Sequence, residues 1–201
     1  MDYVLDWKQL IEFKPTTMTD WPKVRIPFQL DTPYLKREFT LSLVIWNLTE
    51  ETLAQTKGVV DYLLTNFNKL FETAWTALYY FYRQNLQCSL AEFYQEKIDF
   101  NTMYYYSIQI ELNCNYLMDG VPRYHFVVAT ADDLSDDNLR LYMQDNKCWA
   151  CDTNNDGTAI LASANFEDIS LCAASVRKSF EAVYQKMDRG QFQYAPQFGK
   201  E

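Results

Sequence analysis

The chain has few of the residues that interrupt or terminate regular structure. Only 5 of its 201 residues are glycine and 6 are proline, so the turn signals that do occur carry weight. Long apolar runs are also missing. The longest aliphatic stretch, residues 41–46, is far shorter than the roughly 20 residues that cross a bilayer as a helix. The sequence therefore predicts no membrane partner.

Positive charge is scarce as well. The chain has 18 Lys and Arg against 27 Asp and Glu, which gives a net charge of −9. Nucleic-acid binders need clustered cations to contact phosphates, so we predict no nucleic-acid partner. The first residues carry acids where a secretory signal carries positive charge, which favours a cytoplasmic protein.

What is present is typical of one folded domain. Hydrophobic residues make up 48% of the chain and charged residues 22%, a balance that favours a globular protein. We predict a single domain over residues 1–201, with an N-terminal arm at 1–20 and a polar, aromatic tail at 191–201.

Alternating apolar and polar residues predict the strands. Residues 23–30 and 38–46 alternate and are expected to pair as an antiparallel hairpin, with Pro27 at an edge or a bulge. The same pattern predicts further strands at 103–114, 123–129, 139–150 and 158–162.

Helical spacing of apolar residues predicts two main helices. The first begins after Asn47 or Thr49 and runs to about Asn85, either unbroken or broken near 66–68. Leu64 and Phe71 lie on its apolar stripe and are expected to be buried.

The second helix begins near Asn165 or Asp168 and ends at Arg189-Gly190. Together these patterns predict an α+β fold, with an antiparallel sheet on which one long central helix and a C-terminal helix pack.

The cysteines are odd in number, at positions 88, 114, 148, 151 and 172, which favours free buried thiols. Cys148 and Cys151 have the spacing of a redox dithiol or half a zinc site. No second such pair follows in the sequence, so we predict no metal and no cofactor. The alternative is a thiol- or metal-dependent enzyme that uses Cys148, Cys151 and the only histidine, His125.

A second metal-like pattern is weaker. Asp152, Asn154, Asp156 and Gly157 match the first half of a calcium loop, but Ser163 stands where a bidentate Glu is needed. An ordinary hairpin loop that ends in Asp-Gly explains the segment better.

Two features favour a protein partner. Residues 75–82 are so rich in aromatics that one helix face cannot bury them all, which makes Tyr79 and Tyr80 candidate anchors. Acidic residues gather in the second half of the chain, where they would attract a basic partner. These candidate binding residues are Asp132, Asp133, Asp136, Asp137, Asp145, Asp152 and Asp156.

The strand pair, the capped helix that ends in Leu78-Tyr-Tyr-Phe-Tyr82 and the acid-rich sheet together resemble the immunity proteins that bacteria pair with polymorphic toxins. This resemblance implies a non-catalytic inhibitor that binds a basic toxin or effector domain and covers its active site. It assigns no specific site residue. A homo-oligomeric scaffold subunit that associates through the aromatic patch is the other alternative, and the sequence leaves the oligomeric state open.

Overall fold

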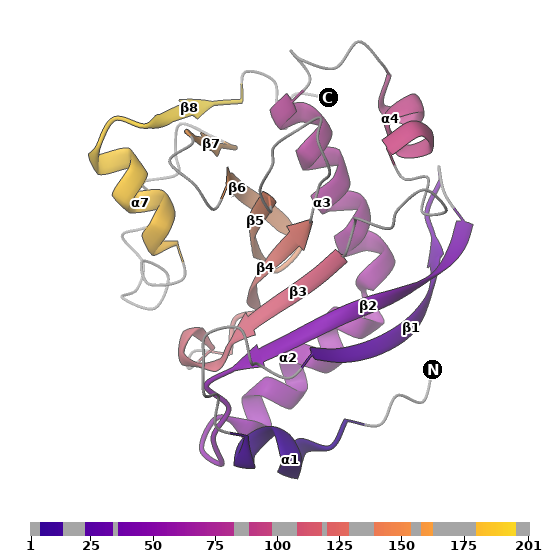
Figure 1. Cartoon of the computed structure of the whole chain (residues 1–201), viewed down its shortest axis with the longest axis vertical. Helices are drawn as coiled ribbons and strands as arrows, with labels where there is room; N and C mark the ends of the chain where they lie inside the picture. Colours follow the sequence, from indigo (N-terminus) through magenta and orange to yellow (C-terminus); the bar gives the residue numbers. More distant parts are fainter. Residues whose placement is uncertain are drawn as a thin grey trace.

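A computed structural model describes residues 5–13, 23–33, 36–82, 89–97, 108–117, 120–128, 139–153, 158–162 and 180–195. In this part of the chain, eight strands form one sheet in which the spatial order follows the sequence order (Figure 1). The strands are β1 (Lys23–Asp31), β2 (Lys36–Trp46), β3 (Ile108–Asn113), β4 (Arg123–Val128), β5 (Leu139–Gln144), β6 (Lys147–Thr153), β7 (Ala159–Leu161) and β8 (Phe192–Tyr194). The α-helices are α1 (Trp7–Glu12), α2 (Leu53–Thr65), α3 (Phe67–Tyr82), α4 (Leu90–Lys97) and α7 (Glu181–Asp188), and a 3₁₀ turn, η1, covers Cys114–Tyr116.

The sheet is mixed, which corrects the prediction of an antiparallel sheet. Neighbouring strands are antiparallel except for two parallel pairs, β2 with β3 and β7 with β8. In both cases helices lie between the two strands in the sequence: α2, α3 and α4 in the first connection, and α7 in the second. A connection that contains a helix can return the chain to the same end of the sheet, and the next strand then runs parallel. The predicted α+β class is confirmed at this coarser level.

The predicted long helix is two helices that meet at Asn66. The backbone N–H and the side-chain Nδ2 of Asn66 both donate to the carbonyl oxygen of Tyr62, at 3.0 and 2.8 Å. This pair of bonds closes the last turn of α2, and α3 begins at the next residue, Phe67. The alternative of a break near 66–68 is therefore confirmed, and the unbroken helix is wrong.

The first strand pair is confirmed, since β1 and β2 are antiparallel with Pro27 on an edge strand opposite Thr40. The single strand predicted at 139–150 is wrong, because it is two strands joined at Asp145 and Asn146. Asp145 has a φ of 48°, a left-handed conformation that Asp tolerates better than most residues. This tight turn lets β6 fold back beside β5.

The C-terminal region also departs from expectation, since residues 192–194 of the predicted tail form β8 beside β7. Helix α7 ends where predicted, because Gly190 adopts a φ of 70° and donates its N–H to the carbonyl of Met187. The predicted beginning of this helix, up to residue 179, lies outside the described residues.

The two faces of the sheet differ in what covers them. We call the face under α2 and α3 the helix face, and the opposite face, which carries α7, the cleft face (Figure 1). Leu64 and Phe71 are buried on the helix face, as predicted, with exposed fractions of 8% and 0%. The Phe71 ring stacks on Trp75, with 5.2 Å between ring centroids, and lies edge-on to Phe126 of β4.

Candidate functional site

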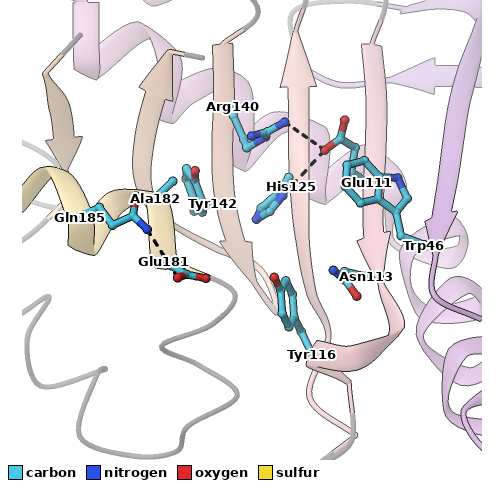
Figure 2. Close-up of a pocket in the computed structure, with 10 residues that line it drawn as sticks. All are labelled: Trp46, Glu111, Asn113, Tyr116, His125, Arg140, Tyr142, Glu181, Ala182 and Gln185. Atoms are coloured by element: carbon cyan, nitrogen blue, oxygen red, sulfur yellow. Dashed lines mark hydrogen bonds and ion pairs between the residues drawn. The ribbon is translucent and has the colours of Figure 1, made fainter. Parts of the chain in front are cut away.

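A cleft of about 290 Å³ lies on the cleft face, between strands β2 to β5 on one side and α7 on the other (Figure 2). Strand alternation places its side chains. Ile110 and Leu112 of β3 enter the core of the helix face, so Glu111 between them points to the cleft. On β4, His125 points to the cleft for the same reason. The strand register sets Glu111 opposite His125, and His125 opposite Tyr142.

Glu111 is held by three neighbours on the floor of the cleft. Nη2 of Arg140 donates to Oε2 of Glu111 at 3.3 Å, and Nε2 of Gln109 donates to Oε1 at 2.7 Å. Nδ1 of His125 lies 3.9 Å from the same Oε2 atom. The Glu111 side chain is only 11% exposed, so these neighbours replace water around its carboxylate.

The pKa of Glu111 follows from this balance. Burial raises it, but the nearby ring of His125 and the charge of Arg140 lower it more, so it lies below its ordinary value. Glu111 is therefore a carboxylate at neutral pH. It acts as the counter-ion of Arg140 within the cleft floor.

Aromatic rings form much of the remaining surface of the cleft. The His125 ring lies edge-on to Tyr142, with 4.7 Å between centroids. Burial, together with the charge of Asp152, raises the pKa of the Tyr142 phenol. Trp46 and Tyr116 border the same cavity and are partly exposed, so their rings are accessible from the cleft (Figure 2).

Helix α7 contributes Glu181 to the opposite wall. This residue is exposed in the first turn of α7, where the helix dipole favours a carboxylate. Nε2 of Gln185 is its hydrogen-bond donor, at 3.5 Å. Burial raises the pKa of Tyr116, and the charge of Glu181 raises it further. The field of Glu181 thus reaches the ring of Tyr116 across the cleft.

Asp152, a predicted partner-binding acid, is instead an internal residue. Its Oδ1 atom pairs with Nζ of Lys186 on α7, and the two side chains are 6% and 11% exposed. The pair ties α7 to β6 beside the cleft. Because Lys186 compensates its charge, Asp152 adds little to long-range attraction, and we remove it from the candidate binding surface.

Asp145 is the one predicted acid that the described residues place on the surface. Its backbone is fixed in the β5–β6 turn, since its N–H donates to Pro122 and its carbonyl accepts from the Tyr124 hydroxyl at 3.0 Å. The other predicted acids lie outside the described residues, and their role stays a prediction. These are Asp132, Asp133, Asp136, Asp137 and Asp156.

The predicted aromatic anchors are largely covered within the chain. Tyr79 is 6% exposed and lies 5.6 Å, between ring centroids, from Phe93 of α4. Tyr80 is half-buried and packs edge-on to Tyr79 at 5.4 Å. The side of α3 that the sequence left without a partner is thus covered by α4. Tyr79 is a core residue, and Tyr80 offers only part of its ring to a partner.

The thiols and the histidine of the alternative enzyme lie on opposite faces of the sheet. Cys148 and Cys151 are buried among the core residues of the helix face, whereas His125 lines the cleft. The sheet separates them, so they cannot form one site. Burial, and then the nearby Cys151, raise the pKa of Cys148 well above its ordinary value. In the described part of the chain, no three His, Cys, Asp or Glu side chains are grouped as metal ligands.

Sequence reasoning missed most of the cleft. Glu111 reads as an ordinary outward-facing strand residue, and Arg140 as a minor counter-charge in an acidic region. Their meeting depends on the register of β3, β4 and β5, which alternation alone does not set. The only signal in the sequence that could have suggested this meeting is that Glu111 and His125 both occupy outward-facing positions of predicted strands.

Comparisons of the chain with protein-family models, with curated proteins and with solved structures found no match. Among the described helices, none is both long enough and apolar enough to cross a membrane.

Proposed function

We propose that this protein is a non-catalytic binding protein, in concrete terms an immunity-type inhibitor that binds and blocks a basic toxin or effector domain. The observation that carries the proposal is the charge of the cleft. Its described lining residues include two carboxylates, those of Glu111 and Glu181, but a single guanidinium, that of Arg140. One negative charge is left over beside accessible aromatic rings, in a chain whose net charge is −9. Such a surface suits a basic partner.

The chemistry of the individual groups favours binding over proton transfer. A general base works best with a pKa near the working pH, whereas the pKa of Glu111 is lowered from a value that is already acidic. Burial raises the pKa of Tyr142 and the pKa of Cys148, so both side chains stay neutral at neutral pH. Glu111, Tyr142 and Cys148 are thus poorly suited to proton transfer or nucleophilic attack at neutral pH.

The test begins with the neighbouring gene. If it encodes a basic domain, that domain is expressed in bacteria with and without this chain, and growth is measured. The proposal expects the domain alone to stop growth and co-expression to restore it. The purified proteins should form a complex whose formation slows as salt rises, because salt screens charge over about 8 Å at physiological ionic strength.

The alternatives give different results in the same experiments. If the neighbouring domain is not toxic, or if this chain neither binds it nor restores growth, the proposal is wrong. A stable homo-oligomer by light scattering, without binding to the neighbouring domain, would instead favour the scaffold alternative.

A further inference from the structure

Among the described residues, the cleft contains one carboxylate, that of Glu181, whose charge no cation compensates. Arg140 pairs with Glu111, and Lys186, the nearest lysine along α7, pairs with Asp152. For Glu181 the partner is the neutral amide of Gln185, at a long 3.5 Å. Glu181 and Tyr116 line the same cavity, and the charge of Glu181 adds to burial in raising the pKa of Tyr116.

Two partly exposed aromatic rings line the same cleft as this carboxylate. Figure 2 shows Tyr116 extending from below into the space between Glu181 and Asn113, with Trp46 on the far side. Both rings are partly exposed. The face of an aromatic ring attracts cations, and a planar guanidinium stacks on it while its N–H groups reach a carboxylate.

From this juxtaposition we propose that the cleft receives the guanidinium group of an arginine side chain from the basic protein partner. Glu181 pairs with the guanidinium, and the ring of Tyr116 stacks against it, with Trp46 on the far side of the cleft. The cavity of about 290 Å³ is near the lower end of the range for small-molecule pockets and has room for one long side chain. That the arginine comes from a basic protein partner rests on the proposed function. That the cleft binds a guanidinium group does not, because it follows from the residues that line the cleft.

Glu111 and Arg140 have a supporting role in this arrangement. Because each already compensates the other, the entering cation meets little repulsion from Arg140 and finds Glu181 as its main counter-charge. An anion is the competing occupant, since it could approach Arg140 and His125. It would have to do so against the charges of both Glu111 and Glu181.

The test uses the full chain and three small probes. N-acetylarginine amide carries the guanidinium, N-acetylcitrulline amide has nearly the same shape without the charge, and N-acetylaspartate amide carries the opposite charge. Each is titrated into ¹⁵N-labelled protein, and NMR shifts are followed at the indole N–H of Trp46 and the backbone amides of Tyr116 and Glu181. We expect saturable shifts at these positions with the arginine probe and at least about tenfold weaker binding of the citrulline probe.

Two variants with the same change of charge locate the binding. Glu181→Gln should weaken the arginine probe by about fivefold or more, since it removes the main counter-charge. Glu51→Gln removes an exposed carboxylate just before α2 that does not line the cleft, and should change binding by less than about twofold. Equal binding by wild type and Glu181→Gln would overturn the proposal. So would equal binding of arginine and citrulline, or tighter binding of the aspartate probe.

The probe titration and the growth test have separate outcomes, so failure of one proposal can be distinguished from failure of the other. If growth is restored by the wild-type chain but the arginine probe does not bind, the inhibitor function stands and the arginine site is wrong. If the probe binds at the cleft but the neighbouring domain does not, the site stands and the inhibitor function is wrong.

Discussion

The two faces of the sheet are formed by the same strands but are stabilised in different ways. On the helix face, β3 contributes Ile110 and Leu112 to a core that α2 and α3 cover. On the cleft face, the same strand contributes Glu111, which needs Arg140, Gln109 and His125 around it. The first face is stabilised by apolar burial alone. The second combines a smaller apolar cluster under α7 with charges that must meet specific partners.

This difference teaches where the fold is adaptable. Apolar contacts on the helix face need no specific direction and accommodate small shifts. The Glu111–Arg140 and Asp152–Lys186 pairs, in contrast, depend on the register of the strands and on the position of α7. The Glu111–Arg140 pair lies in the floor of the cleft, and the Asp152–Lys186 pair holds α7, which forms the opposite wall. Both pairs therefore help to set the shape of the cleft. Most of the apolar core therefore lies on one face and the candidate binding site on the other, and four sets of variants test that comparison.

The largest loss should come from the helix face. Phe71 is fully buried between Trp75 and Phe126, so Phe71→Ala should lower the free energy of unfolding by about 3–5 kcal/mol. Urea denaturation measures it. Phe71→Leu, which keeps most of the volume, should lose clearly less. A loss below about 1 kcal/mol for the alanine variant would mean that this face is not the main core.

The buried pair of the cleft face should rank second. Lys186→Met leaves the carboxylate of Asp152, whose side chain is 6% exposed, without its cation. We expect a loss of about 3 kcal/mol in the same denaturation experiment. The double variant Asp152→Leu/Lys186→Met removes both charges and should recover most of that loss. If the single and double variants are equally unstable, the pair is not what holds α7 on the sheet.

Glu111 should give a smaller loss that depends on pH. Its pKa is lower in the folded protein than its ordinary value, so the carboxylate stabilises the fold above the unfolded pKa of about 4.3. That contribution disappears as the pH falls through the lower folded value. Glu111→Gln should therefore cost about 1–3 kcal/mol at pH 7.

Urea denaturation of both proteins at pH 7, 5 and 3 checks this sign. The difference between wild type and Glu111→Gln should shrink from pH 5 to pH 3, because the wild-type carboxyl becomes protonated. A difference that stays constant across this range would show that the charge of Glu111 is not responsible. Glu51→Gln, an exposed control, should change stability at pH 7 by less than about 0.5 kcal/mol.

The smallest effect on stability should come from the acidic segment that lies outside the described residues. Replacing Asp132, Asp133, Asp136 and Asp137 together by Asn should change the free energy of unfolding by less than about 0.5 kcal/mol, or raise it slightly. Association with a basic partner should slow by about tenfold at low salt, because long-range attraction is lost. Stopped-flow kinetics at several salt concentrations measure this rate. Association that is unchanged at every salt concentration would leave recognition to the cleft and Asp145.

The sequence predicted the elements better than their arrangement. Alternation located β1 and β2 and the inward residues of β3, and helical spacing placed Leu64 and Phe71 in the core. It missed the turn at Asp145, because a continuous alternation looks the same whether it spans one strand or two. It also missed β8, since three residues give too short a pattern to read.

The candidate site was less predictable, and the reason is physical. His125 could be singled out as the only histidine, but its partners come from β3 and β5 and are set by strand register. Tyr79 and Asp152 were chosen as exposed residues, because the sequence does not show that α4 covers one and Lys186 pairs with the other. Exposure depends on contacts between distant segments, which local patterns do not contain.

By itself, the sequence determined the local structure: which residues alternate, where Asn66 or Gly190 can end a helix, and the acidic balance of the chain. These follow from backbone conformation and from counting charges, neither of which needs a distant partner. Only the tertiary structure decided that the sheet is mixed and that Glu111, Arg140 and Glu181 border one cleft. The register of the strands and the position of α7 bring those charges together. A buried carboxylate is stable only where the fold supplies its partners.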